Sequence, residues 1–174
     1  MTSTDVYGGL VRPAPGAVRR VHFHDPDAPV ARVVTPSVFV AVREEQGRLL
    51  LVRRCDSGAW ELPGGRVDVG ESAVRTAVRE TAEEAGLRVR ITGLVGLFTD
   101  PTHVVEAASG EEIRQQFVVC FHAWVIWGRP HPDGHETCDA AWFDPEDVAS
   151  LTLELGARRF VQHALAGASE PYLE

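Results

Sequence analysis

Residues 64–87 read GGRVDVGESAVRTAVRETAEEAGL and carry the strongest local pattern in the chain. We expect a helix from about Ser72 to Gly86. Ser72 is a favourable N-terminal cap, Gly86 can adopt the left-handed conformation that ends a helix, and no proline intervenes. One face is predicted to be buried because its apolar or small residues recur at helical spacing: Val74, Ala77, Val78, Thr81, Ala82 and Ala85.

Three glutamates of this helix are predicted to share a face that lies away from the apolar one. A rotation of about 100° per residue places Glu80, Glu83 and Glu84 within a sector roughly 100° wide. These carboxylates repel one another, and they crowd the last turn, where the helix dipole disfavours negative charge. A solvated acidic face would explain an arbitrary Glu-Glu pair. A bound divalent cation, however, would make each of these unfavourable interactions favourable.

The spacing around the glutamates favours the cation. It resembles the Nudix box at these positions: Gly65, Glu71, Arg79-Glu80, Glu83-Glu84 and Gly86-Leu87. The one departure is Thr81, where the family usually has Leu, Ile or Val. A threonine there costs some apolar burial and should leave the chemistry unchanged.

The resemblance implies a fold and an activity. Pattern alone predicts an α+β domain, and the Nudix fold is a mixed β-sheet sandwiched between α-helices. The implied activity is Mg²⁺-dependent hydrolysis of a phosphoanhydride bond, with Mn²⁺ able to substitute. We expect a flexible arm over residues 1–17, which are rich in Gly and Pro, and a single Nudix domain over residues 18–174.

Roles within the box follow from the resemblance, position by position. Glu80, Glu83 and Glu84 resemble the metal ligands, and one of them could act on the attacking water. The Gly64 carbonyl resembles a further ligand. Arg79 resembles the residue that orients the glutamates, with Glu71 as its partner or as a water-linked ligand. The alternative for Arg79 and Glu71 is a purely structural ion pair.

Two acids outside the box are further candidates by resemblance. Glu112, preferred over Glu111, precedes a long apolar strand where many relatives place a late metal ligand. Glu136 resembles the loop acid that relatives use as a general base or to bind the nucleobase; we slightly favour base recognition. The alternative for each is an ordinary solvated carboxylate.

Substrate contacts are expected from basic and polar residues near the box. Arg53, Arg54 and Arg114 are candidate phosphate ligands, and Gln116 lies on the strand whose wet face should contribute to specificity. Arginines at strand ends are more often simply exposed. Trp60 and Phe98 could stack on a base, although aromatic residues beside strands usually belong to the core.

The rest of the chain predicts a framework of strands. A bend or bulge is expected at Pro36 and a hairpin between the second and third segments. The expected strands are 18–24, 33–42, 48–54, 88–99, 113–127 and 142–143, with 113–127 central. Polar loops are expected at 101–111 and 128–139 and helices from Asp144 and over residues 155–166.

Composition limits the partners. The chain has 174 residues and a formal net charge of −8, which argues against binding a nucleic acid polymer or an anionic membrane. Three cysteines without CxxC spacing, Cys55, Cys120 and Cys138, indicate free thiols in a reducing cytoplasm. We find no pattern of a signal peptide or of a membrane span. A homodimer remains open.

These inferences predict a hydrolase of a small-molecule nucleotide, a nucleoside diphosphate linked to another moiety such as an ADP-ribose-like compound or a nucleotide sugar. One alternative is a (d)NTP pyrophosphohydrolase. Another is a non-catalytic nucleotide-sensing domain, which would more typically have lost a box glutamate. The isomerase branch of the fold is disfavoured because its cysteine context is missing around Cys55.

Overall fold

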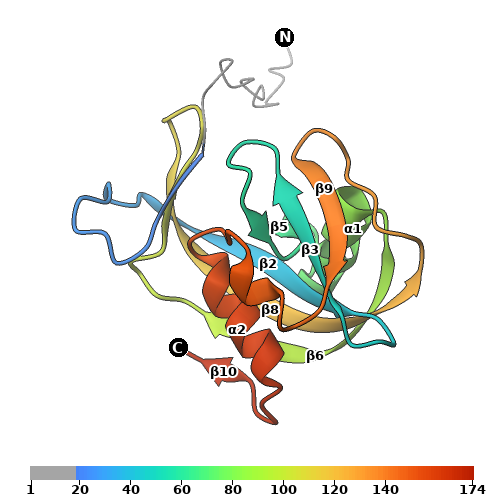
Figure 1. The fold of residues 1–174 in the computed structure, drawn as a ribbon. Helices are drawn as coiled ribbons and strands as arrows, with labels where there is room; N and C mark the ends of the chain where they lie inside the picture. The colour runs from blue at the N-terminus through green and yellow to red at the C-terminus, as the bar shows by residue number, and fades with distance from the viewer. Residues whose placement is uncertain (1–18) are drawn as a thin grey trace, which may run out of the picture.

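The computed structural model describes residues 19–174, so the arm expected over residues 1–17 lies outside the described residues. The described part contains a mixed sheet and two α-helices (Figure 1). Its elements are β1 Arg20–His22, β2 Val33–Arg43, β3 Leu49–Arg54, β4 Trp60–Glu61, β5 Gly64–Arg66, α1 Ala73–Ala85, β6 Arg88–Phe98, β7 Val104–Glu106, β8 Ile113–Trp127, β9 Thr137–Phe143, the 3-10 helix η1 Val148–Ser150, α2 Ala157–Ala166 and β10 Tyr172–Leu173.

The sheet is built around β2 and β8, which run parallel from Val33↔Arg114 to Arg43↔Trp124. This confirms the central position predicted for the strand 113–127. On its other side β8 pairs antiparallel with β6, and the register shifts near Gly93 and Gly96. The shifts lie at glycines because a glycine lets a strand bulge with little steric cost.

The predicted hairpin is correct only at its base, where Arg43 pairs with Leu49. Beyond that point β3 turns to β9, and β2 pairs instead with β5 between Ser37↔Arg66 and Phe39↔Gly64. A pattern of apolar residues predicts a strand but not its partner. Pairing β2 with β3 along its length and pairing it with β5 would bury the same residues of β2. The actual pairing brings Gly64 and Gly65 beside the centre of the sheet.

The bulge expected at Pro36 is absent from the pairing of β2 with β8, which is unbroken at that residue. The Pro36 carbonyl accepts a hydrogen bond from the Val67 amide at 3.1 Å, on the edge away from β8. In a strand, the N–H and C=O of one residue point the same way, so the missing proline donor lies on that edge too. The long parallel ladder therefore loses no bond.

Several boundaries differ from the predictions because long-range pairing decides them. β7 forms inside the expected loop 101–111 by pairing with β8, and β9 begins at Thr137 rather than at Trp142. The acidic segment after Asp144 gives only the short 3-10 helix η1. β10, which sequence analysis missed, pairs parallel with β6. The last helix is confirmed within two residues.

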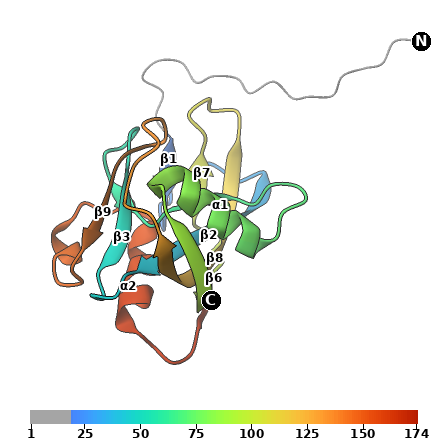
Figure 2. The ribbon, with the colours of Figure 1, turned by 90° about the vertical axis from the view of Figure 1, so that its right-hand side faces the viewer.

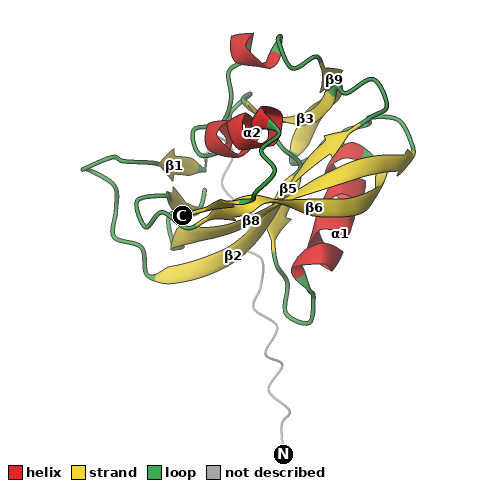
Figure 3. Ribbon diagram, turned by 90° about the horizontal axis from the view of Figure 1, so that it is seen from below, coloured by secondary structure: helices red, strands yellow, loops and turns green. Residues whose placement is uncertain are grey.

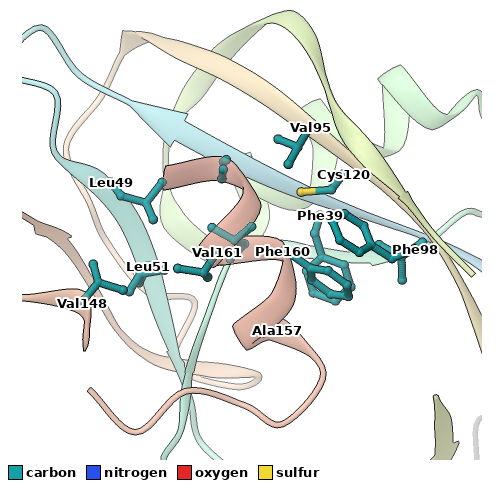
Figure 4. Packing of buried hydrophobic residues seen from close by; sticks show 14 residues of the cluster. Phe39, Leu49, Leu51, Val95, Phe98, Cys120, Val148, Ala157, Phe160 and Val161 are labelled. Carbon is teal, nitrogen blue, oxygen red and sulfur yellow. The ribbon is translucent and has the colours of Figure 1, made fainter. Parts of the chain in front are cut away.

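The two α-helices cover opposite faces of the sheet (Figure 3). Successive residues of β2 face the two helices in alternation: Val38 and Val40 pack toward α1, and Phe39 packs toward α2. Figure 2 shows α1 lying over the strands of the sheet. Figure 4 shows Phe160 of α2 against Phe39 and Phe98. This period-two alternation fits a sheet covered on both sides. Neither helix within residues 19–174 is long and apolar enough to cross a membrane.

Candidate active site

A cavity of about 340 Å³ opens where β5, the start of β8 and α1 meet. Its walls hold acidic and basic side chains together. The acids are Glu61, Asp68, Glu80, Glu83 and Glu136, and the bases are Arg19, Arg54, Arg66, Arg79 and Arg114. Phe39, Ser37 and Gln116 complete the side formed by β2 and β8.

Two glycines of β5 allow the backbone to approach α1 closely. A Cβ atom on Gly65 would overlap the Glu80 carboxylate, and one on Gly64 would overlap the Val38 carbonyl and Phe39. The backbone of β5 can therefore lie against the Glu80 carboxylate of α1 because Gly65 has no side chain, and against β2 because Gly64 has none. This is the structural reason for the glycine pair that opens the motif.

Helix α1 has the ends that the sequence predicts. The Ser72 side chain accepts from the Arg75 amide at 3.3 Å, and Gly86 takes a left-handed conformation with φ 66°. The predicted buried face is confirmed at Ala77, Thr81 and Ala85 and is wrong at Val74, Val78 and Ala82, which are exposed. The inward-facing residues are Thr76, Ala77, Thr81, Glu84 and Ala85. The helix is thus turned so that one carboxylate points inward.

Glu84 is that carboxylate, and only 4% of it is exposed. Its Oε2 accepts a hydrogen bond from the Gly64 amide at 2.8 Å. Burial, followed by the nearby charges of Glu61, Glu80 and Glu136, raises the pKa of Glu84 well above its usual value. Glu84 is thus a buried carboxylate that has one neutral hydrogen-bond donor and lies near other acids. A cation bound beside it would offset both the cost of burying its charge and the repulsion from those acids.

Arg79 connects the acids of the site. Its Nε and Nη2 donate to the two oxygens of Glu71 at 2.9 Å each, a bidentate pair. Its Nη1 donates to Glu80 at 2.9 Å and to Glu83 at 3.0 Å. The Arg79 and Thr76 hydrogen bonds lower the pKa of Glu71 to about 2. Glu71 and Arg79 thus form a fixed ion pair from which Arg79 can reach both helix carboxylates.

The pKa of Glu80 is raised, in contrast to that of Glu71. Burial raises its pKa even though Arg79 lies beside it, and the charges of Glu83 and Glu136 act in the same direction. Within residues 19–174, no three acidic, histidine or cysteine side chains already converge as a coordination shell. Arg79 bridges Glu80 and Glu83 in this arrangement, so both would have to rotate to share an ion. The oxygen donor set itself fits Mg²⁺ or Mn²⁺, which prefer carboxylates and carbonyls.

Comparison with known proteins agrees with this geometry. The model of the NUDIX domain matches residues 33–164. The chain belongs to the Nudix family. It is 36% identical over 123 residues to a protein named ADP-ribose pyrophosphatase from Methanocaldococcus jannaschii, covering 68% of each chain. It is 29% identical over 147 residues to a CTP pyrophosphohydrolase of Escherichia coli K12, covering 79% of this chain and 87% of that one.

A solved structure shows the same fold. The ADP-ribose pyrophosphatase from Streptococcus suis 89-1591 matches with a TM-score of 0.62 and 24% identity, over 80% of this chain and 96% of that one. The chain is therefore a Nudix hydrolase with the mixed-sheet α+β Nudix fold predicted from its sequence.

The two acids predicted outside the Nudix box have different places. Glu136 lines the cavity and lies close enough for its charge to affect Glu80 and Glu84. Glu112 is not among the residues that line the cavity. Its carboxylate accepts from Arg66 at 2.8 Å and from Arg114 at 3.2 Å. The structure therefore brings Glu136, but not Glu112, to the carboxylate cluster of the Nudix box.

The three arginines predicted to bind phosphate differ in their position relative to the cavity and in their carboxylate partners. Arg114 lines the cavity, whereas Arg53 lies near Asp139 at 3.6 Å and over the Trp60 ring. Arg54 reaches the cavity, but its guanidinium is bound by Asp56 and Glu61. Only Arg114 thus offers a cavity-facing cation whose one carboxylate partner among the described residues is the half-exposed Glu112.

The polar and aromatic candidates are resolved by burial. Gln116 lines the cavity, 4% exposed, and its Oε1 accepts from the Ser37 hydroxyl at 2.7 Å. Phe98 is buried against Phe160, so it belongs to the core, which was the usual role expected of such an aromatic residue, and it is not available to stack on a base. Trp60 packs edge-on against Phe143. The aromatic side chain that reaches the cavity is Phe39.

Sequence analysis missed Glu61, which is 3% exposed and whose charge raises the pKa of Glu84. It receives a hydrogen bond from Arg54 at 2.9 Å and lies 3.7 Å from Arg19. An acid between Trp60 and Leu62, in a short apolar segment just before the glycine pair, was the available signal.

Proposed function

We propose that this Nudix hydrolase cleaves a phosphoanhydride bond in a nucleoside diphosphate linked to another moiety, with Mg²⁺ or Mn²⁺ held by Glu80, Glu83, Glu84 and the Gly64 carbonyl. The observation that carries the proposal is the position of Glu84. It is a buried acid that accepts a hydrogen bond from Gly64, and Gly64 lines a cavity that arginines also line. When bound, the cation neutralises phosphate charge and makes a water nucleophilic near neutral pH.

The side chains of this protein would supply orientation and charge. Arg79, fixed by Glu71, would release Glu80 and Glu83 for the cation and then orient them. Arg114, which also lines the cavity, would bind a phosphate group of the substrate or the moiety linked to the nucleoside diphosphate. The Gln116 carbonyl is held by Ser37, and so its amide group is left to donate to a substrate acceptor.

The substrate we favour is ADP-ribose-like or a nucleotide sugar. A relative that is 36% identical is named ADP-ribose pyrophosphatase, which supports this choice. The alternative, a (d)NTP pyrophosphohydrolase, is supported by the relative named CTP pyrophosphohydrolase. Turnover of a panel of both classes separates them by product. The first releases a nucleoside monophosphate and a phosphorylated second moiety, and the alternative releases a monophosphate and pyrophosphate.

The cation requirement is tested with the same panel. Turnover should need Mg²⁺ or Mn²⁺, and either ion should raise the melting temperature. At an ion concentration 100 times Kd, the free energy of unfolding should rise by about 2.7 kcal/mol. Glu83→Gln should weaken both effects, and Glu45→Gln, at an exposed turn position, should change neither. Full turnover in excess chelator would contradict the proposal. Binding without turnover of any compound would favour the nucleotide-sensing alternative.

Glu136 has two candidate roles, which kinetics separates. If it is a general base, Glu136→Gln should lower kcat for every substrate alike. If it binds the nucleobase, the ratio of kcat/KM between purine and pyrimidine substrates should change, because one lost hydrogen bond to a base costs on the order of 1–3 kcal/mol. We favour recognition. Unchanged kinetics on every substrate would remove Glu136 from the site.

A further inference from the structure

Two cysteines meet at the seam between β3 and β9, which lie side by side in Figure 1. Cys55 directly follows β3, and its amide donates to the Glu136 carbonyl at 2.9 Å. Cys138 is the second residue of β9, at the point where the register of the two strands shifts. The Cys138 Sγ lies 3.6 Å from the carbonyl oxygen of Arg54, which belongs to the peptide bond that joins Arg54 to Cys55, so the two cysteines are neighbours across the seam.

The irregular register explains this proximity. Arg54 pairs with Thr137 and Arg53 with Asp139, so Cys138 is the extra residue of a bulge. Its Sγ lies 3.4 Å from the Arg53 carbonyl oxygen and 3.6 Å from that of Arg54, and so it points along β3. Cys55 and Cys138 are both exposed, whereas Cys120 is fully buried. Small soluble reagents can therefore reach the pair.

The same seam holds residues of the active site. Arg54, which lines the cavity, precedes Cys55, and Glu136 lies two residues before Cys138. Between them, the Thr137 hydroxyl donates to the Glu84 carbonyl oxygen at 2.8 Å. A covalent bond across this seam would therefore restrict the segment that presents Glu136 to the cavity.

We propose that Cys55 and Cys138 are a redox-active pair that closes to an intramolecular disulfide and thereby lowers turnover. The oxidant is a low-molecular-weight disulfide, such as oxidised glutathione. One protein thiolate attacks it, forming a mixed disulfide and releasing one small thiol. The second protein thiolate then attacks the sulfur of the first cysteine, forming the bond and releasing the second small thiol. Two protein thiols are oxidised, and one small disulfide is reduced to two thiols.

A metal site is the competing role for two adjacent thiols. Soft-metal sites need three or four ligands, and among residues 19–174 no third cysteine, histidine or acid completes such a group. Desolvation of the thiol, the neighbouring Cys138 and the charges of Asp133 and Asp56 raise the pKa of Cys55, which reduces its thiolate fraction at neutral pH. The exchange is consequently expected to proceed faster at pH 8.5 than at pH 7.

The test incubates the full chain with oxidised glutathione at pH 8.5 and then blocks the free thiols. Intact mass and peptide mapping should show a monomer with one disulfide, between Cys55 and Cys138, which dithiothreitol reduces. Cys55→Ser and Cys138→Ser should leave one blocked or glutathionylated thiol and no internal bond. Cys120→Ala is the matched control and should still form it. Only mixed disulfides or intermolecular dimers would overturn the proposal.

The effect on turnover is a second readout, and this part rests on the proposed function. Oxidation should lower kcat/KM at least about threefold, reversibly with dithiothreitol, in the wild type and in Cys120→Ala but in neither serine variant. An internal disulfide with unchanged kcat/KM would overturn the regulatory role. If the reduced enzyme turns over none of the panel, the proposed function fails, whereas the mass measurement still decides the pairing.

Discussion

The two helices of this protein bury different chemistry on opposite faces of one sheet. α2 buries Phe160, Val161 and Ala164 among apolar neighbours. α1 buries Thr76, Thr81 and Glu84, and it leaves Val74 and Val78 exposed. The α2 face resembles an ordinary core. The α1 face has less apolar burial and places an acid at the glycine pair of β5, an arrangement that fits the catalytic role proposed for Glu84.

Buried ionisable groups on the two faces also respond to pH in opposite directions. On the α1 side, burial raises the pKa of Glu84 and Glu80, so the fold favours their protonated forms and loses stability as pH rises. On the α2 side, His103 lies near Phe160 with 5% of its surface exposed. Burial, together with Arg159 and Arg19, lowers its pKa to about 4, so the fold favours neutral His103 and loses stability as pH falls.

The largest expected effect is that of Glu84→Gln on turnover. Losing this charge should lower kcat/KM by roughly 10²–10⁴-fold. The metal-free fold should become more stable, increasingly so at higher pH, because the buried charge and its repulsion from Glu61 and Glu80 disappear. Kinetics with Mg²⁺ and thermal melting in chelator between pH 6 and pH 8 measure the two effects. An unfolded variant with normal turnover per folded molecule would mean that α1 is packed for stability after all.

Phe160→Ala should have the opposite profile. It leaves a void against Phe39 and Phe98, and we expect a loss of about 3–5 kcal/mol in the free energy of unfolding. Denaturant unfolding measures this loss, and kcat per folded molecule should stay near that of the wild type. Phe160→Leu, which fills part of the void, should lose less. A kcat that falls while stability stays unchanged would remove the distinction between the two faces.

Acid should destabilise the α2 side through His103. An unfolded histidine has a pKa near 6.5 and folded His103 one of about 4, so the unfolded state binds the extra proton first as pH falls. The resulting loss accumulates between these values and reaches up to roughly 3 kcal/mol. Denaturant unfolding from pH 7 to pH 4 measures it, and His103→Gln should show a smaller slope over that range. Equal slopes would mean that His103 does not titrate differently on folding.

Thr81→Val should have the smallest effect, although it changes a fully buried position of the Nudix box. The Thr81 hydroxyl donates only to the Ala77 carbonyl one turn earlier, at 2.8 Å, so its removal leaves no unpaired donor. We expect a change within about 1 kcal/mol and unchanged turnover. Thermal melting and kinetics check this, and a loss of turnover would assign Thr81 a part in the site that its position does not suggest.

Within the helix, the sequence predicted its two ends, the Glu71–Arg79 pair and the glutamate cluster, since caps and side-chain spacing are local properties of a helix. It predicted the buried face only in part, because Val74 and Val78 fit the helical spacing of apolar residues and yet are exposed. Glu112 and Glu136 looked alike in sequence. The partner of each acid depends on where a loop returns, and the sequence does not record that.

By itself, the sequence determined the family, the fold class and the carboxylates of the box, because a motif held within one helix and one turn needs no distant contact. Tertiary structure alone decided that β2 leaves β3 after one residue pair and pairs with β5 instead. This pairing places Gly64 where its amide donates to Glu84. Tertiary structure also decided that Glu61 joins the cluster and that Cys138 lies beside the peptide bond that precedes Cys55. Strand partners and bulges set these contacts, and they depend on the twist and closure of the whole sheet.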